Sequence, residues 1–245
     1  MKIIAPENLK IRFILLVSLF TVFAGLVGGT IITNLFTVVD VAAEKSKYKT
    51  VIIDAGHGGP DGGTSSDDGT LEKTINLQIA HKLNEILNAM GINTVMTRTE
   101  DISIHDESAN TIREKKISDI RNRLSITNNT PDSVFVSIHQ NHFSQSKYRG
   151  TQVFYSKNNP HSQILADSIR LSVISSLQPE NSREIKPSGS DIYLLYHAQI
   201  PAVMVECGFL SNYDESQELK NEEYQRKLAF TIALGIIDFL KNTEA

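Results

Sequence analysis

Short β-branched runs alternate along the chain with longer segments whose apolar residues recur at helical spacing. The short runs are typical of buried strands, which read as nearly continuous apolar stretches; they cover residues 50–54, 92–97, 133–138, 151–155 and 202–205. The longer segments predict amphipathic helices; they cover residues 71–90, 113–127, 161–177 and 224–240. This alternation predicts an α/β sheet with helices on both faces.

The length and composition are those of one ordinary globular domain with a short appendage. The chain has 245 residues, of which 40% are hydrophobic and 21% charged, which fits a packed core rather than a disordered chain. The formal net charge of −4 gives no sign of binding to a polyanion, so we expect no nucleic acid partner. Cys207 is the only cysteine, which excludes an intramolecular disulfide and leaves the core, a metal, or both to provide stability.

Residues 1–43 read as a hydrophobic signal or membrane anchor. Three basic residues precede an uncharged run at 13–39, which exceeds the roughly 20 apolar residues that span a bilayer. The run has no polar face, which disfavours a buried core helix. Small residues at 41–43 would suit cleavage, but we favour an uncleaved anchor. Either alternative places the remainder outside the cytoplasm, membrane-anchored or secreted. Residues 44–49 would then be a linker to a catalytic domain at 50–245.

Four residues with metal-site chemistry stand where strands of the predicted sheet end. His57 follows the first strand, His139 ends the third, and Glu206 ends the late strand. Glu72 opens the helix after the first strand. Ligands of such sheets bind at the carboxyl ends of the strands. Zinc is commonly held by three residues of these types with a fourth position open to water. The pattern therefore predicts a metal site at this edge.

Each of these residues also has a purely structural interpretation. His57 would be an ordinary polar loop residue, Glu72 a first-turn acid near the helix dipole, and His139 a hydrogen-bonded core histidine. Glu206 is harder to explain in this way, because a carboxylate that ends a buried strand is costly unless it is paired or metal-bound. Their joint placement favours the metal site over four independent structural roles.

The loop "GHGGPDGG" around His57 has other candidate roles that fit less well. It lacks the Gly-Lys-Ser/Thr of a phosphate-binding loop and does not match the dinucleotide pattern. Its Asp61, together with Asp67 and Asp68, does not have the spacing of a calcium-binding EF-hand loop. We expect residues 60–70 to be a solvated loop, whose glycines keep the backbone from blocking the approach to a metal on His57.

Several motifs in fixed order resemble the zinc-dependent N-acetylmuramoyl-L-alanine amidases of type 3. The motifs are "VIIDAGHGGPDGG", "LEKTINLQIAHKL", "VMTRTED", "SVFVSIHQN" and "IPAVMVECGFLSN", which together extend from about Thr50 to Leu240. The resemblance implies a single three-layer αβα domain around a mixed, mostly parallel sheet. The chain departs from the family pattern at Ala55, where proline is usual, and at Gln140, where a small residue is common. Neither departure falls on a ligand position.

The resemblance also implies roles for the four residues at the strand ends. His57, Glu72 and His139 match the residues that bind one zinc ion, and Glu206 matches the catalytic glutamate. The implied reaction is hydrolysis of the amide between the lactyl group of N-acetylmuramic acid and L-alanine in peptidoglycan. A zinc peptidase of the stem peptide and an inactive wall-bound regulator of the same fold are the alternatives, although an intact Glu206 disfavours the regulator.

Other polar residues near these motifs have open roles. Asn141 would orient a ligand or the substrate, with a turn role as the alternative. Arg123 would meet a peptide carboxylate of the substrate, with a surface salt bridge as the alternative. His142 is the nearest substitute for His139 as a ligand. Cys207 should point away from Glu206 on a strand, so we expect a buried, inert thiol rather than a nucleophile.

Within the family, the compact amidases of spore-cortex peptidoglycan are most similar in layout. The shared features are an N-terminal hydrophobic segment, the "GHGGPDGG" loop, the basic stretch "REKKISDIRNRL" and the absence of wall-binding repeats. This implies a role in maturation of the spore cortex, in which the muramic lactam needed for germination is formed. It also implies action in the space around the forespore. An activating protein partner is a further expectation.

Overall fold

A six-stranded sheet lies at the centre of residues 46–243, the part of the chain that the computed structural model describes. The strands are ordered β2-β1-β3-β6-β4-β5 across the sheet. Their bounds are Thr50–Ala55 for β1, Asn93–Met96 for β2, Ser133–Asn141 for β3, Gln152–Tyr155 for β4, Lys186–Pro187 for β5 and Ala202–Phe209 for β6. The predicted signal or anchor at residues 1–43 lies outside the described residues.

The sheet is mixed and mostly parallel, as predicted. Strands β2, β1, β3 and β6 all run in one direction, so their carboxyl ends meet at a single edge. Strand β4 pairs antiparallel with β6, and β5 pairs parallel with β4. The inner parallel strands β1, β3 and β6 are largely buried on both faces because helices cover both sides of the sheet, whereas the edge strand β2 is partly exposed.

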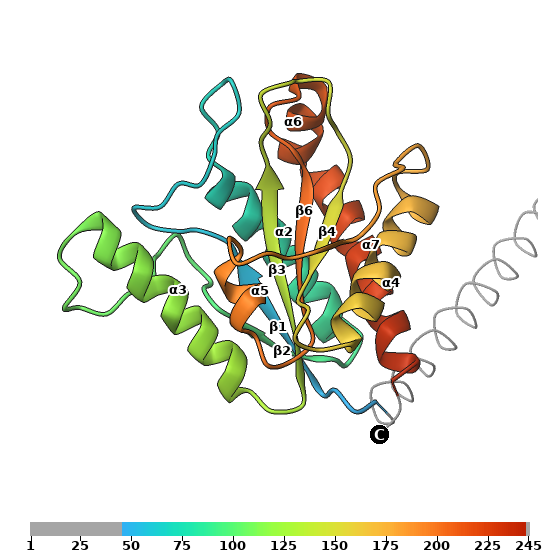
Figure 1. Ribbon diagram of the computed structural model, residues 1–245. Helices are drawn as coiled ribbons and strands as arrows, with labels where there is room; N and C mark the ends of the chain where they lie inside the picture. Colours follow the sequence, from blue (N-terminus) through green and yellow to red (C-terminus); the bar gives the residue numbers. More distant parts are fainter. Residues whose placement is uncertain (1–45, 244–245) are drawn as a thin grey trace, which may run out of the picture. The chain divides into compact units, whose positions relative to one another are not determined.

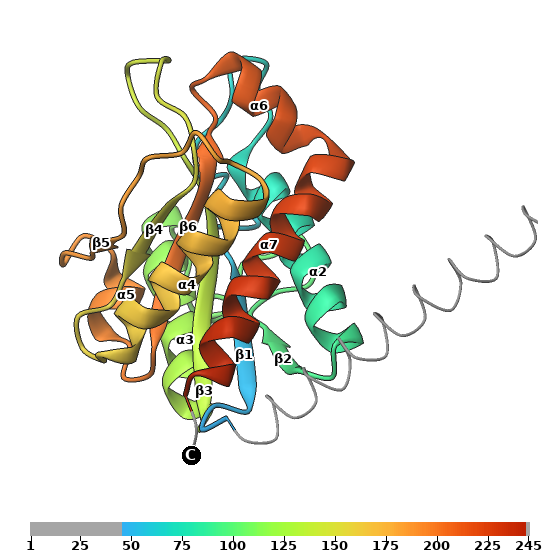
Figure 2. The ribbon, with the colours of Figure 1, turned by 90° about the vertical axis from the view of Figure 1, so that its right-hand side faces the viewer.

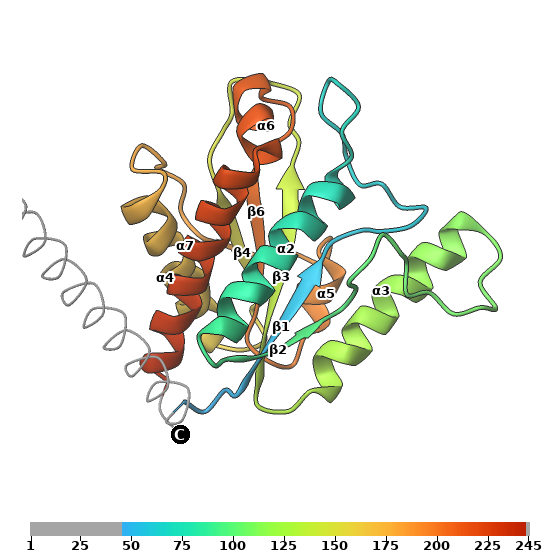
Figure 3. The ribbon, with the colours of Figure 1, turned by 180° about the vertical axis from the view of Figure 1, so that it is seen from behind.

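Helices form one layer on each face of the sheet (Figures 1 and 3), and the layers are seen from the side in Figure 2. On one face lie α2 (Glu72–Ala89), α4 (His161–Ser176) and α7 (Glu222–Lys241). On the other lie α3 (Ile112–Asn129) and the short α5 (Tyr193–His197). Helix α6 (Tyr213–Lys220) lies at the end of the sheet to which the parallel strands point (Figure 1). This confirms the predicted three-layer αβα domain.

Side chains that alternate along the strands fill a separate core on each face. Toward α3 and α5, Ile52, Phe135 and Met204 pack with Leu195. The residues between them, such as Val136, point into the opposite layer. A Thr111–Glu114 capping box starts α3. Gly91 ends the turn after α2 with a φ of 75°, a conformation that favours glycine.

Two strands continue past the ends expected from sequence. β3 extends to Asn141 and β6 to Phe209, so His139 and Glu206 lie inside their strands rather than at the last residue. The ladder persists because these polar residues pair with each other in register, and a bulge follows them. Strand β5 and helices α5 and α6 were not predicted from the sequence, because they are too short or too polar to show a clear period.

The described part of the predicted linker packs against the domain. Tyr48 is buried, its hydroxyl lies 2.8 Å from His161 Nδ1, and its ring stacks on Phe239. The amide of Lys47 donates to the carbonyl of Thr243 near the end of the described chain. Residues 46–49 therefore belong to the folded unit. Between residues 46 and 243, none of the helices has the length and apolar character needed to cross a bilayer.

Candidate active site

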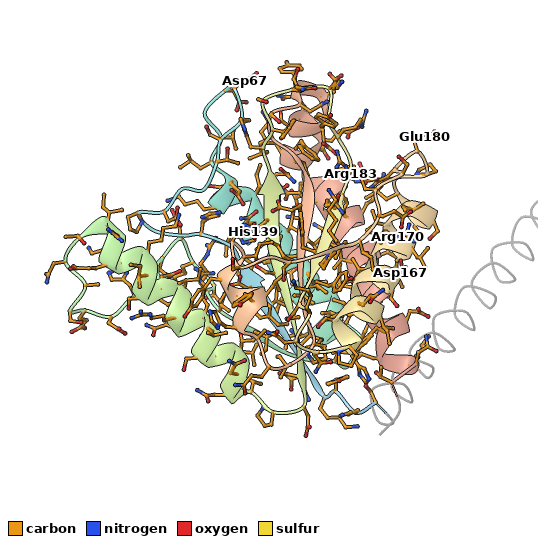
Figure 4. The ribbon with its side chains drawn as sticks, in the orientation of Figure 1. Asp67, His139, Asp167, Arg170, Glu180 and Arg183 are labelled. Atoms are coloured by element: carbon orange, nitrogen blue, oxygen red, sulfur yellow. The ribbon has the colours of Figure 1, made fainter. Side chains whose placement is uncertain are left out.

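The three predicted zinc ligands converge at the edge where the parallel strands end. His57 lies in the loop after β1, Glu72 is the first residue of α2, and His139 lies on β3 (Figure 4). Glu72 bridges the two rings, with its Oε2 3.2 Å from His57 Nε2 and its Oε1 2.9 Å from His139 Nδ1. One donor atom from each residue lies within 4.8 Å of the other two.

The cluster fits a zinc ion in its chemistry as well as its size. Two imidazole nitrogens and one carboxylate oxygen are a donor set that catalytic zinc sites use. His57 Nδ1 lies 2.9 Å from Asp61 Oδ2, which leaves Nε2 directed at Glu72. An outer carboxylate of this kind fixes the tautomer and orientation of a ligating histidine. Asp61 was weighed in the sequence only as a calcium ligand, and its spacing of four residues from His57 was the overlooked signal.

The charged groups of the cluster shift one another's pKa values. Burial alone would lower the pKa of His57, but hydrogen bonds with Asp61 and Glu72 outweigh it and raise the pKa to about 9. Burial would raise the pKa of Glu72, yet the two histidines hold it well below its usual range. In the absence of a metal, the cluster therefore favours an ionised carboxylate between two histidines.

The glycines around His57 make room for the ligand side chains. A Cβ on Gly56 would overlap the ring of His139, and a Cβ on Gly63 would lie 2.5 Å from Glu72 Oε2. Gly63 also has a φ of +68°, a conformation that favours glycine. His57 itself has a φ of 63°, which is strained for a residue with a side chain. These glycines therefore make room for the packing of the ligands, and their role in an open approach to a metal stays a prediction.

Two buried arginines bind the backbone that carries His57. Arg98 donates to the carbonyls of Ala55 and Gly56 at 2.8 and 3.1 Å. Arg123 donates to the carbonyls of Ala55 and His57 at 2.8 and 2.7 Å. Three successive carbonyls are therefore held by guanidinium groups, which helps the loop to keep its strained conformation.

The interpretation of Arg123 from sequence was wrong in both of its forms. The side chain is 2% exposed, so it is neither a surface salt bridge nor open to a substrate. Its Nη1 lies 2.6 Å from Asp54 Oδ1, and its Nε lies 2.7 Å from Asp119 Oδ2. The charged character of α3 concealed this inward residue. Arg98 was not singled out at all, although it stands in the motif "VMTRTED".

Glu206 lies beside the cluster on the neighbouring strand. It pairs in register with His139, so the two side chains share a face of the sheet. Its Oε2 is buried and has no hydrogen-bond partner among residues 46–243. Burial raises its pKa from 4.5 to about 7, with the nearby Glu72 adding to the rise and His139 opposing it. A carboxyl group with such a pKa can both accept and donate a proton near neutral pH.

The remaining residues singled out from sequence do not join the cluster. Asn141 is half-buried at the end of β3, where its carbonyl accepts from the amide of Leu210 at 2.9 Å. His142 is exposed, and it is not part of the donor group found within residues 46–243. Cys207 is fully buried, which confirms that part of its prediction, and burial raises the pKa of its thiol.

Comparison with known proteins agrees with this fold and site. A family model described as N-acetylmuramoyl-L-alanine amidase matches residues 51–238. The germination-specific N-acetylmuramoyl-L-alanine amidase of Bacillus subtilis (strain 168) is 31% identical over 195 residues, which cover 78% of this chain and 79% of that protein.

Solved structures give the same result. The CwlD amidase from Clostridioides difficile, solved in complex with the GerS lipoprotein, is 43% identical with a TM-score of 0.76. The match covers 79% of this chain and 99% of that one. An N-acetylmuramoyl-L-alanine amidase from Clostridium difficile 630 is 32% identical with a TM-score of 0.68, over 80% of this chain and 98% of that one. From the family match and these relatives, the chain belongs to the N-acetylmuramoyl-L-alanine amidases, the hydrolases that act on cell-wall peptidoglycan.

Proposed function

We propose that the chain is a zinc-dependent amidase in which His57, Glu72 and His139 hold one zinc ion and Glu206 transfers protons. The observation that carries this proposal is the position of Glu206. A buried carboxylate oxygen without a partner is costly, and here it adjoins a group of three zinc-type donors. Catalysis explains why such a residue is kept.

The bond to be broken joins the lactyl carbonyl of N-acetylmuramic acid to the nitrogen of L-alanine. A bound zinc ion would supply Lewis-acid chemistry, polarising the carbonyl and making water more acidic. The Glu206 carboxylate would accept a proton from a water molecule while the oxygen of that water adds to the carbonyl carbon. The same group would then donate that proton to the alanine nitrogen as the C–N bond breaks. Asp61, Arg98 and Arg123 would keep His57 oriented throughout.

A role in spore-cortex maturation and germination is the second part of the proposal. It is supported by the similarity to the germination-specific amidase of B. subtilis and to CwlD of C. difficile. Cell-wall amidases act outside the cytoplasm, and residues 1–43 would anchor or export the domain into the space around the forespore. Because the C. difficile CwlD was solved with a lipoprotein, we also propose that a protein partner activates this chain.

Product analysis of the purified protein on peptidoglycan tests the activity. We expect muropeptides with a free lactyl carboxylate and stem peptides with a free L-alanine amine, together with one zinc ion per chain. Cleavage between amino acids of the stem would instead indicate a zinc peptidase. Absence of any cleavage, with zinc bound and with the partner supplied, would indicate a regulator of the same fold.

The ligand assignment predicts that His139→Ala removes most of the bound zinc, because each histidine provides one of three protein ligands. The measurement is zinc content after gel filtration, with a competing chelator to compare affinities. His142→Ala is the matched control and should keep its zinc. Retention of near-stoichiometric zinc in His139→Ala would contradict the assignment.

A further inference from the structure

A second site lies at the same edge of the sheet as Glu206. A pocket of ≈ 630 Å³ is bounded by the loop before β4, the segment after α4, and α6. Its lining includes Tyr148, Gly150 and Arg183, and it shares no residue with the candidate metal cluster. Figure 4 shows Arg183 beside the upper ends of β4 and β6.

The pocket is connected to Glu206 through the sheet. Gln152 on β4 pairs in register with Glu206, and the Gln152 side-chain amide donates to the carbonyl of Glu184. Arg183 precedes Glu184 directly, and its guanidinium lies over the ring of Phe209, 4.5 Å from the centroid. Given the spacing of residues and strands in a sheet, Arg183 lies on the order of 10 Å from the Glu206 carboxylate.

Arg183 is fixed in place but is not neutralised. Its Nε donates to the carbonyl of Arg149 at 2.8 Å, and its guanidinium lies 5.9 Å from the ring centroid of Tyr148. Within residues 46–243, no carboxylate forms an ion pair with it. Three acids nearby are engaged elsewhere, since Glu218 pairs with Arg149, Glu184 pairs with Arg170, and Glu215 accepts from the amides of Gly150 and Phe209. Glu180 also lines the pocket and is exposed.

Such an arrangement suits the binding of a carboxylate. A guanidinium stacked on aromatic rings loses little freedom when it binds, and its terminal N–H groups match a carboxylate in bidentate geometry. In a stem peptide whose second residue is a γ-linked glutamate, that residue carries a free α-carboxylate, and a third residue that is diaminopimelate carries another. An extended peptide covers about 3.3–3.6 Å per residue, so these groups fall within reach of Arg183.

We propose that Arg183 binds a free carboxylate of the stem peptide and thereby selects acidic over amidated peptidoglycan. This inference rests on the proposed function, because it assumes that the scissile amide lies at Glu206. Arg183 would thus make the contact with a substrate carboxylate that the sequence offered for Arg123 as one of two alternatives.

Three substrates in a kinetic comparison test the proposal. They are muropeptides with free carboxylates, with the carboxyl of the second residue amidated, and with that of the third amidated. We expect Arg183→Gln to lower kcat/KM for the free form by roughly 10-fold to 100-fold, mainly through KM, as the loss of one charge-assisted contact predicts. Amidation at the contacted carboxyl should have the same effect on the wild type and none on the variant, which identifies the residue bound.

The matched control is Arg170→Gln on α4. Arg170 is also a half-buried arginine, but it is paired with Asp167 (Figure 4) and with Glu184, so its loss removes a comparable charge beside Arg183 and should leave substrate choice unchanged. Zinc content and thermal unfolding of each variant show whether the fold is intact. Arg183→Lys should recover part of the discrimination. Equal losses on all three substrates would assign Arg183 a packing role only, and unchanged kinetics would also overturn the proposal. If the wild type cleaves none of the substrates, it is the proposed function that fails.

Discussion

Two acidic side chains on the central strands have opposite environments. Asp54, near the end of β1, is 1% exposed and accepts hydrogen bonds from Thr97, Ser137 and Arg123 at 2.6–2.7 Å. Glu206, on β6, has a buried oxygen with no hydrogen-bond partner in the described part of the chain. Burial raises the pKa of both, but around Asp54 the contacts with Arg123, Ser137 and Thr97 prevail and lower it, whereas at Glu206 the pKa rises to about 7.

The difference separates a carboxylate that supports the fold from one that is available for chemistry. Asp54 is ionised at every pH near neutrality, and it holds the arginine that binds the His57 loop. Glu206 has no such support, so its protonation can change at working pH. A buried carboxylate is therefore a weak indicator of function until its partners are known.

Glu206→Gln should give the largest effect. Glutamine keeps the shape of the side chain but cannot transfer a proton, so turnover should fall by about 10²- to 10⁴-fold. Zinc content and the unfolding midpoint should stay close to those of the wild type. Loss of zinc would make Glu206 a ligand and Glu72 the candidate base, and near-normal turnover would refute the mechanism.

Asp54→Asn should affect stability rather than the proton-transfer step. Removing the charge of Asp54 leaves the buried Arg123 paired with the more exposed Asp119, at a cost of up to about 3–5 kcal/mol in the free energy of unfolding. Urea denaturation measures this value. Asp119→Asn is the control and should cost less, since Asp119 is more exposed and Arg123 keeps Asp54. Equal losses would show that Asp54 has no special role.

The two carboxylates should give pH dependences of opposite sign in the metal-free protein. The lowered pKa of Asp54 adds stability that is present above about pH 4 and is lost as the pH falls through the folded-state value. The raised pKa of Glu206 makes stability fall as the pH rises from 4.5 to about 7. Each slope is at most about 1.4 kcal/mol per pH unit. The free energy of unfolding, measured across pH 3–8 for the wild type, Asp54→Asn and Glu206→Gln, gives both slopes. Curves for the two variants that run parallel to that of the wild type would contradict the comparison.

Cys207→Ser should have the smallest effect on catalysis. Cys207 follows Glu206 on β6, so its side chain points to the opposite face, and its pKa is raised by burial. We expect wild-type turnover, with a stability loss of about 1–3 kcal/mol from burying a hydroxyl. A loss of hydrolysis in a folded, zinc-containing variant would restore the thiol as a participant.

The sequence was sufficient to predict those parts of the fold and site that depend on a local periodicity or on the end of a strand. The alternation of apolar patterns predicted four of the helices and most of the sheet. The strand-end rule predicted that His57, Glu72 and His139 would meet. Contacts between segments that are distant in the chain could not be predicted from the sequence. Arg123 reaches Asp54 only because β1 and α3 are brought together by the fold, and no spacing along the chain indicates this.

Short elements and unpaired groups escaped prediction for related reasons. β5 has two residues and α5 has five, too few to show a period. Arg183 forms no ion pair within residues 46–243 because the carboxylate oxygens of nearby acids point elsewhere, and the sequence does not specify these directions. The strand-end rule also placed Glu206 at the end of β6, because it does not show how far pairing with β3 continues.

The candidate cluster takes its three members from chain positions as far apart as 57 and 139, and this has a consequence for folding. His57 and His139 become neighbours only after β1 and β3 have paired in parallel, across the whole of α2, β2 and α3. Contacts between such distant segments form slowly, because the intervening chain must first be closed into a loop. Metal uptake at this site would therefore be a late event, and the bound fraction would report how many molecules have completed their topology.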